Sequence, residues 1–274
     1  MADGLAALTL TPVVPGEKVK LGAKAASVAG PVDKLALEAA TDGLLTRLSE
    51  LQQAFHADGR QALLLVLQGR DASGKDGVIK TVYGAFNPTG VQVAAFGPPT
   101  SLEQRHDFLW RVHQVVPPRG MVGVFNRSHY EDVLAVRVRG LAPESVWRPR
   151  YAHINDFERM LTDSGVIIRK CMLHVSRDEQ HGRLKARLED ATKNWKFRLE
   201  DLEDRARWDA YTDAYREMLE QCSTPWAPWF VVPANDKAVR NYLIARLLVD
   251  TLEEAAPAFP LMDDAVRAAA KGFA

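Results

Sequence analysis

An apolar strand that runs directly into a glycine-rich loop constrains the fold of this chain more than any other feature. Residues 62–67 (ALLLVL) are uniformly apolar, and residues 69–76 (GRDASGKD) follow them closely. The order G-x-x-x-x-G-K after a strand predicts a phosphate-binding loop, in which backbone N–H groups surround phosphate oxygens. Lys75 would reach the more distal phosphates, and a helix expected over residues 74–86 would present its positive end. The alternative is a strand–turn–helix unit without a ligand.

The residue after this lysine departs from the usual pattern. A Ser or Thr at that position supplies the hydroxyl that holds Mg²⁺, whereas this chain has Asp76 and carries a further carboxylate, Asp71, within the loop. We therefore expect carboxylates rather than a hydroxyl to hold the metal. The residues expected to contact phosphate are Gly69, Arg70, Ala72, Ser73, Gly74, Lys75, Asp76, Lys80 and Arg127.

Composition excludes several classes of protein. The 35 basic and 35 acidic residues among 274 cancel, so no overall field favours nucleic acid or a membrane surface. No apolar run reaches the 18 residues of a membrane span, and the first residues do not form a secretory signal. Cys171 and Cys222 match neither a disulfide framework nor a zinc site. We expect a soluble cytoplasmic protein that binds neither nucleic acid nor membranes.

Strand and helix patterns alternate along the chain. Strands are expected over residues 62–67, 91–96, 121–125, 166–175 and 228–233, and helices over 33–56, 74–86, 102–115, 143–162, 178–222 and 235–255. Ser101 and Gln104 resemble a capping box. This alternation predicts an α/β fold with a mainly parallel five-stranded sheet covered on both faces. We divide the chain into an N-terminal arm with an amphipathic helix (1–58) and a main domain (59–274).

A second polar cluster follows the strand expected over residues 121–125. Residues 126–132 read NRSHYED. Arg127 could bind a phosphate through both arms of its guanidinium, and Glu131 and Asp132 are candidates to hold a metal or orient an acceptor. Because ligands bind beyond the carboxyl ends of parallel strands, we expect this cluster and the phosphate loop to share one site. The alternative is a solvated loop, and His129 is expected to be structural.

A basic block next to an acidic block forms the third cluster. Residues 169–198 hold nine basic and four acidic side chains, a local charge of +5, and residues 199–220 hold three and eight, a local charge of −5. We interpret the basic block as part of a lid, over about residues 176–222, that closes on phosphates. The alternative is a solvated charged helix. The aromatic residues expected to serve in packing are Trp195, Trp208, Tyr211 and Tyr215.

Together these clusters resemble a family-2 polyphosphate kinase, from about Pro15 to the final helix. The similar segments are residues 69–77 (GRDASGKDG), 125–133 (FNRSHYEDV), 194–198 (NWKFR), 207–208 (RW) with Tyr211, and 233–237 (PANDK). The resemblance implies a three-layer αβα fold of the thymidylate-kinase type with a helical lid. It also implies reversible phosphoryl transfer between inorganic polyphosphate and AMP or ADP, with Mg²⁺, or alternatively Mn²⁺, as cofactor.

The resemblance also assigns residues. It implies catalytic roles for Asp71, Lys75, Arg127, Glu131 and Asp132, and lid roles for Arg183, Arg187, Lys193 and Lys196. Many relatives that accept only nucleoside diphosphates have Asp-Arg-Ser-Trp-Tyr-Asn-Arg where this chain has residues 126–132. The carboxylate of this motif therefore moves to Glu131 or Asp132, as in relatives that phosphorylate AMP as well as ADP. The candidate metal ligands are Asp71, Asn126, Glu131 and Asp132.

Two other functions compete with this interpretation. An ATP-dependent kinase of nucleotides or other small molecules would share the loop and the lid but use another donor. A polyanion-binding module would need the basic block but not the carboxylates at positions 71, 131 and 132, so we rank it last. The expected partners are inorganic polyphosphate, adenine nucleotides, guanine nucleotides as a second option, and further copies of this chain in a homodimer or homotetramer.

Overall fold

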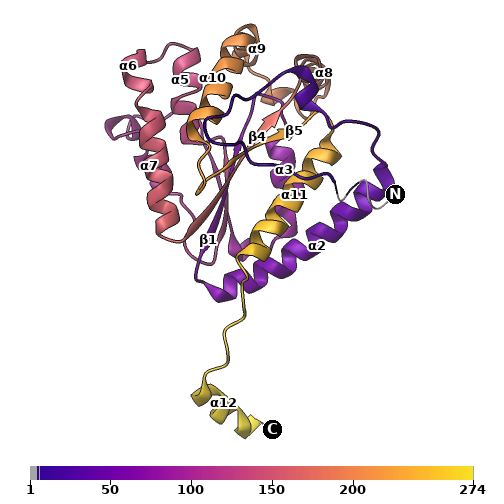
Figure 1. The fold of residues 1–274 in the computed structure, drawn as a ribbon, viewed down its shortest axis with the longest axis vertical. Helices are drawn as coiled ribbons and strands as arrows, with labels where there is room; N and C mark the ends of the chain where they lie inside the picture. Colours follow the sequence, from indigo (N-terminus) through magenta and orange to yellow (C-terminus); the bar gives the residue numbers. More distant parts are fainter. Residues whose placement is uncertain (1–4, 6, 274) are drawn as a thin grey trace.

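The computed structural model describes residue 5 and residues 7–273, and it is built on one parallel β-sheet (Figure 1). Its five strands lie in the order β2-β3-β1-β4-β5. Their bounds are β1 Ala62–Gln68, β2 Val91–Ala95, β3 Val122–Asn126, β4 Val166–His174 and β5 Trp229–Pro233. All four neighbouring pairs are parallel. The predicted α/β class and the parallel five-stranded sheet are confirmed.

Strand β1 occupies the centre of the sheet and is buried on both faces. Leu63, Leu65 and Leu67 face one apolar cluster, and Leu64 and Val66 face the other. A strand covered on both faces needs apolar residues at every position, which explains why residues 62–67 show no alternation. The loop after β1 therefore starts from a rigid, enclosed position.

One face of the sheet is covered by three helices. They are α2 (Lys34–Asp58), α3 (Lys75–Thr81) and α11 (Lys237–Glu254), which contribute Leu48, Val78 and Leu248 to one cluster with β1. Asp33 caps the start of α2 by accepting a hydrogen bond from the Ala36 backbone N–H. The helix ends at Gly59, whose φ of 62° is readily adopted only by glycine. The division of the chain at residue 58 stays a prediction.

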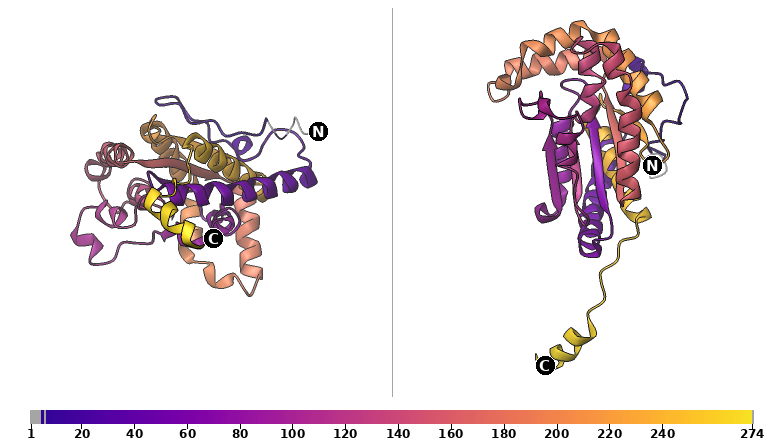
Figure 2. Two further views of the ribbon diagram at one scale, coloured as in Figure 1. Left: turned by 90° about the horizontal axis from the view of Figure 1, so that it is seen from below. Right: turned by 90° about the vertical axis from the view of Figure 1, so that its left-hand side faces the viewer.

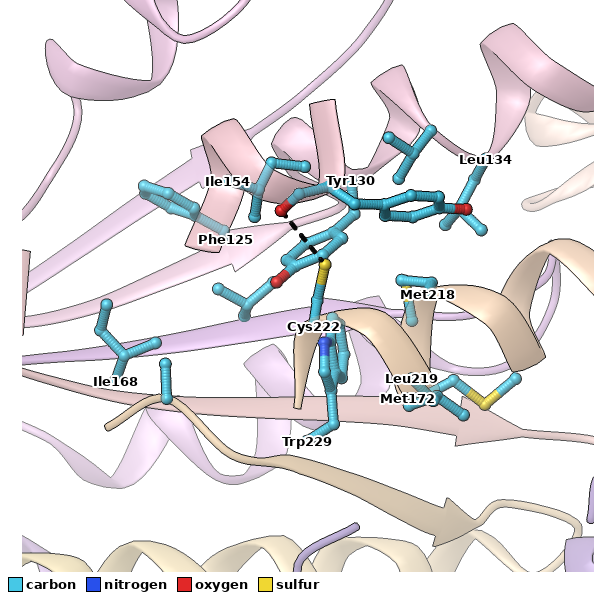
Figure 3. Close-up of a cluster of buried hydrophobic side chains, with 14 of the residues drawn as sticks. Phe125, Tyr130, Leu134, Ile154, Ile168, Met172, Met218, Leu219, Cys222 and Trp229 are labelled. Atoms are coloured by element: carbon cyan, nitrogen blue, oxygen red, sulfur yellow. Dashed lines mark hydrogen bonds between the residues drawn. The ribbon is translucent and has the colours of Figure 1, made fainter. Parts of the chain in front are cut away.

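The other face is covered by α7 (Arg150–Asp163) and α10 (Trp208–Cys222). Figure 3 shows their contact with the sheet, where Ile154 and Met218 approach Phe125, Met172 and Trp229. The Tyr130 ring, from the loop after β3, also lies in this cluster, with its centroid 4.8 Å from that of Trp229. The polar segment after β3 is thus anchored in the core.

The prediction of one continuous helix over residues 102–115 is wrong. The structure has a 3₁₀ turn, η4 (Glu103–Arg105), and a single helical turn, α4 (Trp110–His113). Between them the Asp107 carboxylate accepts a hydrogen bond from the Leu109 N–H at 2.9 Å, which competes with helix formation. The capping box is formed by Thr100 and Glu103 rather than by Ser101 and Gln104.

Other expected helices are divided into shorter ones. The helix expected over residues 74–86 is α3 followed by η2 (Tyr83–Ala85), and η3 (Pro88–Gly90) comes after it. Pro149 separates α6 (Glu144–Trp147) from α7. The region 178–222 comprises α8 (Arg177–Glu189), η6 (Asn194–Lys196), α9 (Leu199–Ala206) and α10. The remaining short elements are η1 (Ala23–Ala26), η5 (His129–Asp132), α5 (Ala135–Val138), α12 (Asp264–Ala270) and η7 (Lys271–Phe273).

The lid elements and the C-terminal segment lie at opposite ends of the molecule (Figure 2). Helices α8 and α9 extend over the carboxyl end of the sheet, whereas α12 lies well away from the body at the other end. In the described part of the chain, no helix is both long and apolar enough to cross a membrane.

Candidate active site

A cavity of about 1080 Å³ lies at the carboxyl end of the sheet. Four segments line it: the phosphate loop, residues 95–111, residues 126–150 and the lid residues 187–201. Its lining includes Asp71, Lys75, Arg127, Glu131 and Asp132. The two polar clusters that follow β1 and β3 therefore meet in one site, as their positions after parallel strands predict.

The phosphate loop depends on residues in the left-handed conformation. Gly69, Ala72 and Gly74 have φ angles of 152°, 61° and 103°. A Cβ atom at Gly69 would lie 2.7 Å from the carbonyl oxygen of Leu173, and one at Gly74 would lie 1.9 Å from Nη1 of Arg240. Gly69 is therefore required both for its conformation and for the space beside the Leu173 backbone, and Gly74 is required for its conformation.

Lys75 lies inside this loop rather than on its surface. Its side chain is largely enclosed, and Nζ donates hydrogen bonds to the carbonyl oxygens of Gly69 at 2.8 Å and Arg70 at 3.3 Å. Burial lowers its pKa to about 8, and the nearby Arg127 acts in the same direction. The ammonium group is thus held at the base of the loop, within the cavity lining.

Side chains from α8 bind the carbonyl groups of the phosphate loop. Gln180 donates a hydrogen bond to the Asp71 carbonyl at 3.1 Å, and Arg183 donates to those of Ala72 and Ser73 at 3.0 and 3.1 Å. In a planar trans peptide the C=O and the adjoining N–H point in opposite directions. Fixing these carbonyls toward α8 therefore directs the N–H groups of the same peptide units away from it. Arg183 does not line the cavity, contrary to its expected role as a phosphate-facing lid cation.

Arg70 also points away from the cavity, so the expected phosphate contact is wrong for its side chain. Its guanidinium carbon lies 3.8 Å from the ring centroid of Trp208, and Nη2 donates to the Trp208 carbonyl at 2.9 Å and to Thr212. Burial lowers its pKa to about 10. A flat guanidinium suits stacking on an aromatic face, so Arg70 links the loop to the start of α10. The expected packing roles of Trp208, Tyr211 and Tyr215 are confirmed.

Arg127 lies between two carboxylates in the cavity. Its guanidinium contacts Asp71 directly and Oε1 of Glu131 at 3.4 Å, and Gln68 donates to the same Glu131 oxygen at 3.3 Å. Its pKa is raised, chiefly by Glu131. Burial acts to raise the pKa of Asp71, but the surrounding cations, led by Arg127, lower it below its ordinary value. Both carboxylates are therefore paired with one cation.

The other two candidate metal ligands have different partners. Asp132 pairs with Arg150 at 3.0 Å and with Arg111 at 3.8 Å, and burial raises its pKa although both arginines oppose the shift. Asn126 donates a hydrogen bond to Asp76 at 2.8 Å, whose other oxygen lies 3.3 Å from Nζ of Lys196. The four predicted ligands thus do not converge on one point.

The donor set still suits a hard cation. Among the described residues, no group of three or more His, Cys, Asp and Glu side chains is arranged to enclose a metal ion. Mg²⁺, however, is commonly bound by one or two carboxylates together with water and substrate phosphates. Asp71 and Glu131, which approach the same guanidinium in the cavity, provide such a pair.

The lid contributes cations to the cavity from its distal part. Arg187 and Lys196 line it, and Arg187 lies 3.5 Å from Asp201. Lys193 pairs with Asp190 outside the lining, and Lys80 is exposed on α3 and outside it as well. Trp195 is 73% exposed and lines the cavity, so its expected role in packing is wrong.

Several cavity residues carry no motif signal in the sequence. Arg198 of the 194–198 segment lines the cavity too, and the residues without a motif signal are Arg111, Arg139, Arg150 and Asp201. Arg139 forms a two-pronged ion pair with Asp204 of α9, which connects the segment after α5 to the lid. Each stands alone among ordinary surface residues in the sequence, and only the fold brings them to one cavity.

Comparisons with known proteins agree on one family. The family model described as Polyphosphate kinase 2 matches residues 32–260. An AMP/ADP-polyphosphate phosphotransferase of Meiothermus ruber is 53% identical over 214 residues, covering 78% of this chain and 80% of that protein. An ADP-polyphosphate phosphotransferase of Rhodopseudomonas palustris is 44% identical over 226 residues, covering 78% of each.

A solved structure agrees over nearly the whole length. The crystal structure of Polyphosphate Kinase 2 from Arthrobacter aurescens TC1 superposes with a TM-score of 0.86 at 42% identity, covering 97% of this chain and 99% of that one. The loop, the second cluster and the lid of this chain all lie within residues 32–260, which the family model matches. The chain belongs to the polyphosphate kinase 2 family.

Proposed function

We propose that this protein transfers a phosphoryl group reversibly between inorganic polyphosphate and AMP or ADP, forming ADP or ATP. One observation carries the proposal: a phosphate loop with a buried lysine, two carboxylates paired with one arginine, and lid cations all line a single cavity. The names of the two relatives described above, one acting on AMP and ADP and one on ADP, support it.

The residues divide into three roles in this proposal. Lys75 and the loop N–H groups bind the phosphates at the base of the cavity. Arg127 neutralises charge that develops on the transferred group, and Arg187 and Lys196 hold the polyphosphate chain from the lid side. The substrate provides its own leaving phosphate, so the protein mainly positions the reactants and compensates their charge.

Mg²⁺ is the cofactor in this proposal, with Mn²⁺ as the alternative. Asp71 and Glu131 would hold it, since both carboxylates already share a cationic partner in the cavity. The ion supplies charge neutralisation at the phosphate oxygens. Asp132, paired with Arg150 and Arg111, instead forms part of the cavity wall.

The test is nucleotide formation from AMP and ADP with polyphosphate as donor, compared with ATP as donor for AMP. We expect turnover with polyphosphate and a decrease in kcat of about a hundred- to thousand-fold in Lys75→Ala, the usual effect of losing one preorganised charge-stabilising donor. Lys185→Ala, at an exposed lysine of α8 outside the cavity, is the control and should retain parental kcat. Turnover that requires ATP and ignores polyphosphate would instead support the ATP-dependent alternative.

We assign to Glu131 the preference between AMP and ADP as the phosphoryl acceptor. The resemblance implies that this residue carries charge at a position where many relatives that accept only nucleoside diphosphates have Asn, and it lies in the cavity beside Arg127. Beside an AMP phosphate, the carboxylate has room to bind an ion or water, whereas it would repel the additional phosphate of ADP. In Glu131→Asn, kcat/KM for AMP should fall about tenfold relative to that for ADP, a differential of about 1.4 kcal/mol. An unchanged ratio would place the selection elsewhere in the cavity.

Three further expectations stay predictions. They concern the use of guanine nucleotides, assembly into a homodimer or homotetramer, and a cytoplasmic location. Parallel assays with GMP and GDP, together with the molecular mass in solution, address the first two, and fractionation of cells addresses the third.

A further inference from the structure

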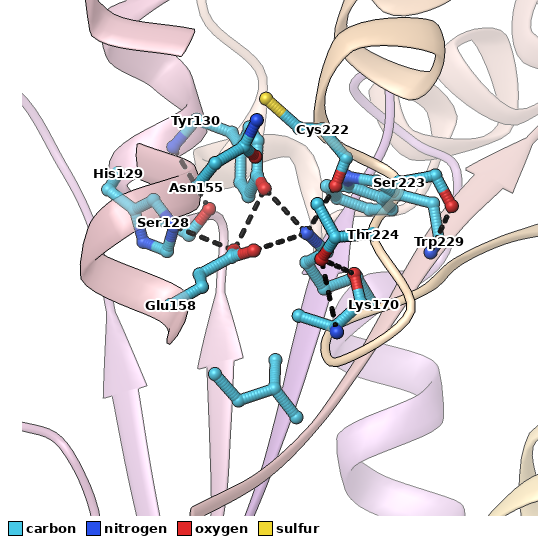
Figure 4. A network of polar contacts seen from close by, with 12 residues as sticks. Ser128, His129, Tyr130, Asn155, Glu158, Lys170, Cys222, Ser223, Thr224 and Trp229 are labelled. Atoms are coloured by element: carbon cyan, nitrogen blue, oxygen red, sulfur yellow. Dashed lines mark hydrogen bonds and ion pairs between the residues drawn. The ribbon is translucent and has the colours of Figure 1, made fainter. Parts of the chain in front are cut away.

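A buried ion pair lies next to the turn after β3, where Figure 4 shows Glu158 and Lys170 beside His129 and Tyr130. Glu158, from α7, and Lys170, from β4, have side chains that are 1% and 0% exposed. Burial acts to raise the pKa of Glu158, but Lys170 and His129 outweigh it, so that its pKa lies below the ordinary value. The Glu158 carboxylate is therefore ionised inside the apolar core described above.

This pair belongs to a network of buried hydrogen bonds. Lys170 Nζ donates to Glu158, to the Tyr130 hydroxyl at 2.7 Å and to the Cys222 carbonyl at 2.7 Å, so all three of its protons are used. The Tyr130 hydroxyl donates in turn to Glu158 at 2.8 Å, and Nε2 of His129 lies 3.3 Å from the same oxygen. The network thus joins α7, β4, the end of α10 and the turn η5.

Stability alone does not account for a pair of this kind. Removing two charges from water is costly, and well-packed apolar side chains of similar volume often stabilise a core equally well or better. Here the Lys170 ammonium has an acceptor for each of its protons, although Nδ1 of His129 has no partner among the described residues. A network in which the charged groups are satisfied does, however, limit the arrangements open to the groups that it joins. The network therefore explains conformational precision better than it explains the free energy of unfolding.

The turn above the network requires such precision. Arg127 has a φ of 62°, a left-handed conformation that a residue other than glycine keeps only when its surroundings impose it. The next three residues, Ser128, His129 and Tyr130, are buried, and Ser128 Oγ accepts a hydrogen bond from the Tyr130 N–H. Buried residues thus fix the turn between Arg127 and Glu131, the two side chains that line the cavity.

We propose that Glu158 and Lys170 are positioning residues which, through Tyr130 and His129, hold Arg127 and Glu131 in the orientation needed for phosphoryl transfer. They contact no substrate. This inference rests on the proposed function of the cavity for its readout, but the geometry that carries it lies entirely within the core.

The first test removes the hydrogen bonds and charges of the network but keeps side chains of similar volume. Tyr130→Phe deletes the hydroxyl that joins the pair to the turn, and the double variant Glu158→Gln with Lys170→Met removes both charges together. We expect both variants to fold, by circular dichroism and thermal unfolding, and to show kcat at least tenfold below that of the parent with nucleotide KM within about twofold. Small displacements of reacting groups are sufficient for such losses.

The matched control is Cys222→Ala in the same cluster. It removes a thiol that contacts the Tyr151 carbonyl but retains the Cys222 backbone oxygen that Lys170 binds. This variant should lower the thermal unfolding midpoint while kcat, measured well below that midpoint, stays at the parental value. If the network variants behave in the same way, the pair is only structural and the proposal fails.

A double-mutant cycle provides a readout that a purely structural role would not change. If Tyr130→Phe already misplaces Arg127, then Arg127→Ala should reduce kcat much less in that background than in the parent. Equal fold-reductions in the two backgrounds would overturn the proposal. A parent without polyphosphate turnover would contradict the proposed function alone, and the cycle would then be measured with the donor that the parent uses.

Discussion

At the scale of single residues, the structure determines the pH at which Lys75 loses its proton. The ammonium group is enclosed by the phosphate loop, and burial lowers its pKa to about 8. The folded protein therefore releases this proton at a lower pH than an unfolded chain, in which a lysine has a pKa near 10.4. Lys75 is mostly charged at pH 7 and mostly neutral at pH 9.

We expect kcat/KM for polyphosphate to fall as the pH rises through about 8. The free enzyme loses the positive charge that attracts phosphate, and kcat/KM reports ionisations of the free enzyme. Phosphate groups with a second pKa of about 6 are already fully ionised there, so the substrate does not cause the decrease. The measurement is kcat/KM against pH for the parent and Lys75→Arg. The same decrease in Lys75→Arg, whose guanidinium stays charged, would contradict the assignment.

At the scale of secondary-structure elements, the lid is attached to the phosphate loop at two places, and the distal part between these attachments lies over the cavity. Gln180 and Arg183 attach α8 to the carbonyls of the phosphate loop, and Arg70 attaches the start of α10 to the same loop. The cavity cations Arg187 and Lys196 lie between these attachments. That the distal part moves stays a prediction.

We expect Arg187→Ala combined with Lys196→Ala to raise the polyphosphate KM by about tenfold at low salt. An exposed ion pair is typically worth about 0.2–1 kcal/mol because salt screens it, so the loss of two such contacts amounts to about 1.4 kcal/mol, or tenfold. The increase of KM with ionic strength should therefore be shallower in the double variant than in the parent. Lys185→Ala, outside the cavity on α8, is the control and should keep the parental slope. Unchanged KM and slope in the double variant would show that this part of the lid is only solvated.

At the scale of the whole molecule, a net charge of zero conceals a local concentration of charge. The 35 basic and 35 acidic residues balance, yet the cavity combines Lys75 with Arg127, Arg187 and Lys196, and each of the last three already pairs with a carboxylate. A polyanion can exchange with these carboxylates for the same cations. The molecule therefore needs no overall basic field to bind phosphate, because the cations that line the cavity act locally.

The sequence alone determined the sheet, the phosphate loop and the shared location of the loop and the 126–132 cluster. These features depend on local rules: a run of apolar residues for a doubly buried strand, glycines for left-handed turns, and ligand groups after parallel strands. The apolar run, the glycines and the polar residues after each strand are each visible in a short stretch of the sequence. Periodicity was less informative where a polar side chain competes for backbone hydrogen bonds, as Asp107 does in the segment expected to form a helix.

Only the tertiary structure decided which way individual side chains point. Arg70 and Lys75 belong to one motif, yet Arg70 stacks on Trp208 while Lys75 remains in the loop. Arg183 binds loop carbonyls, whereas Arg187, four residues further along α8, lines the cavity. The sequence also contained no sign of the network beneath the second cluster, because Glu158 and Lys170 contact Tyr130 only through the packing of α7 against the sheet. Motif spacing specifies where the backbone passes, but the partners available in space determine whether a charged side chain turns toward a ligand or toward the protein.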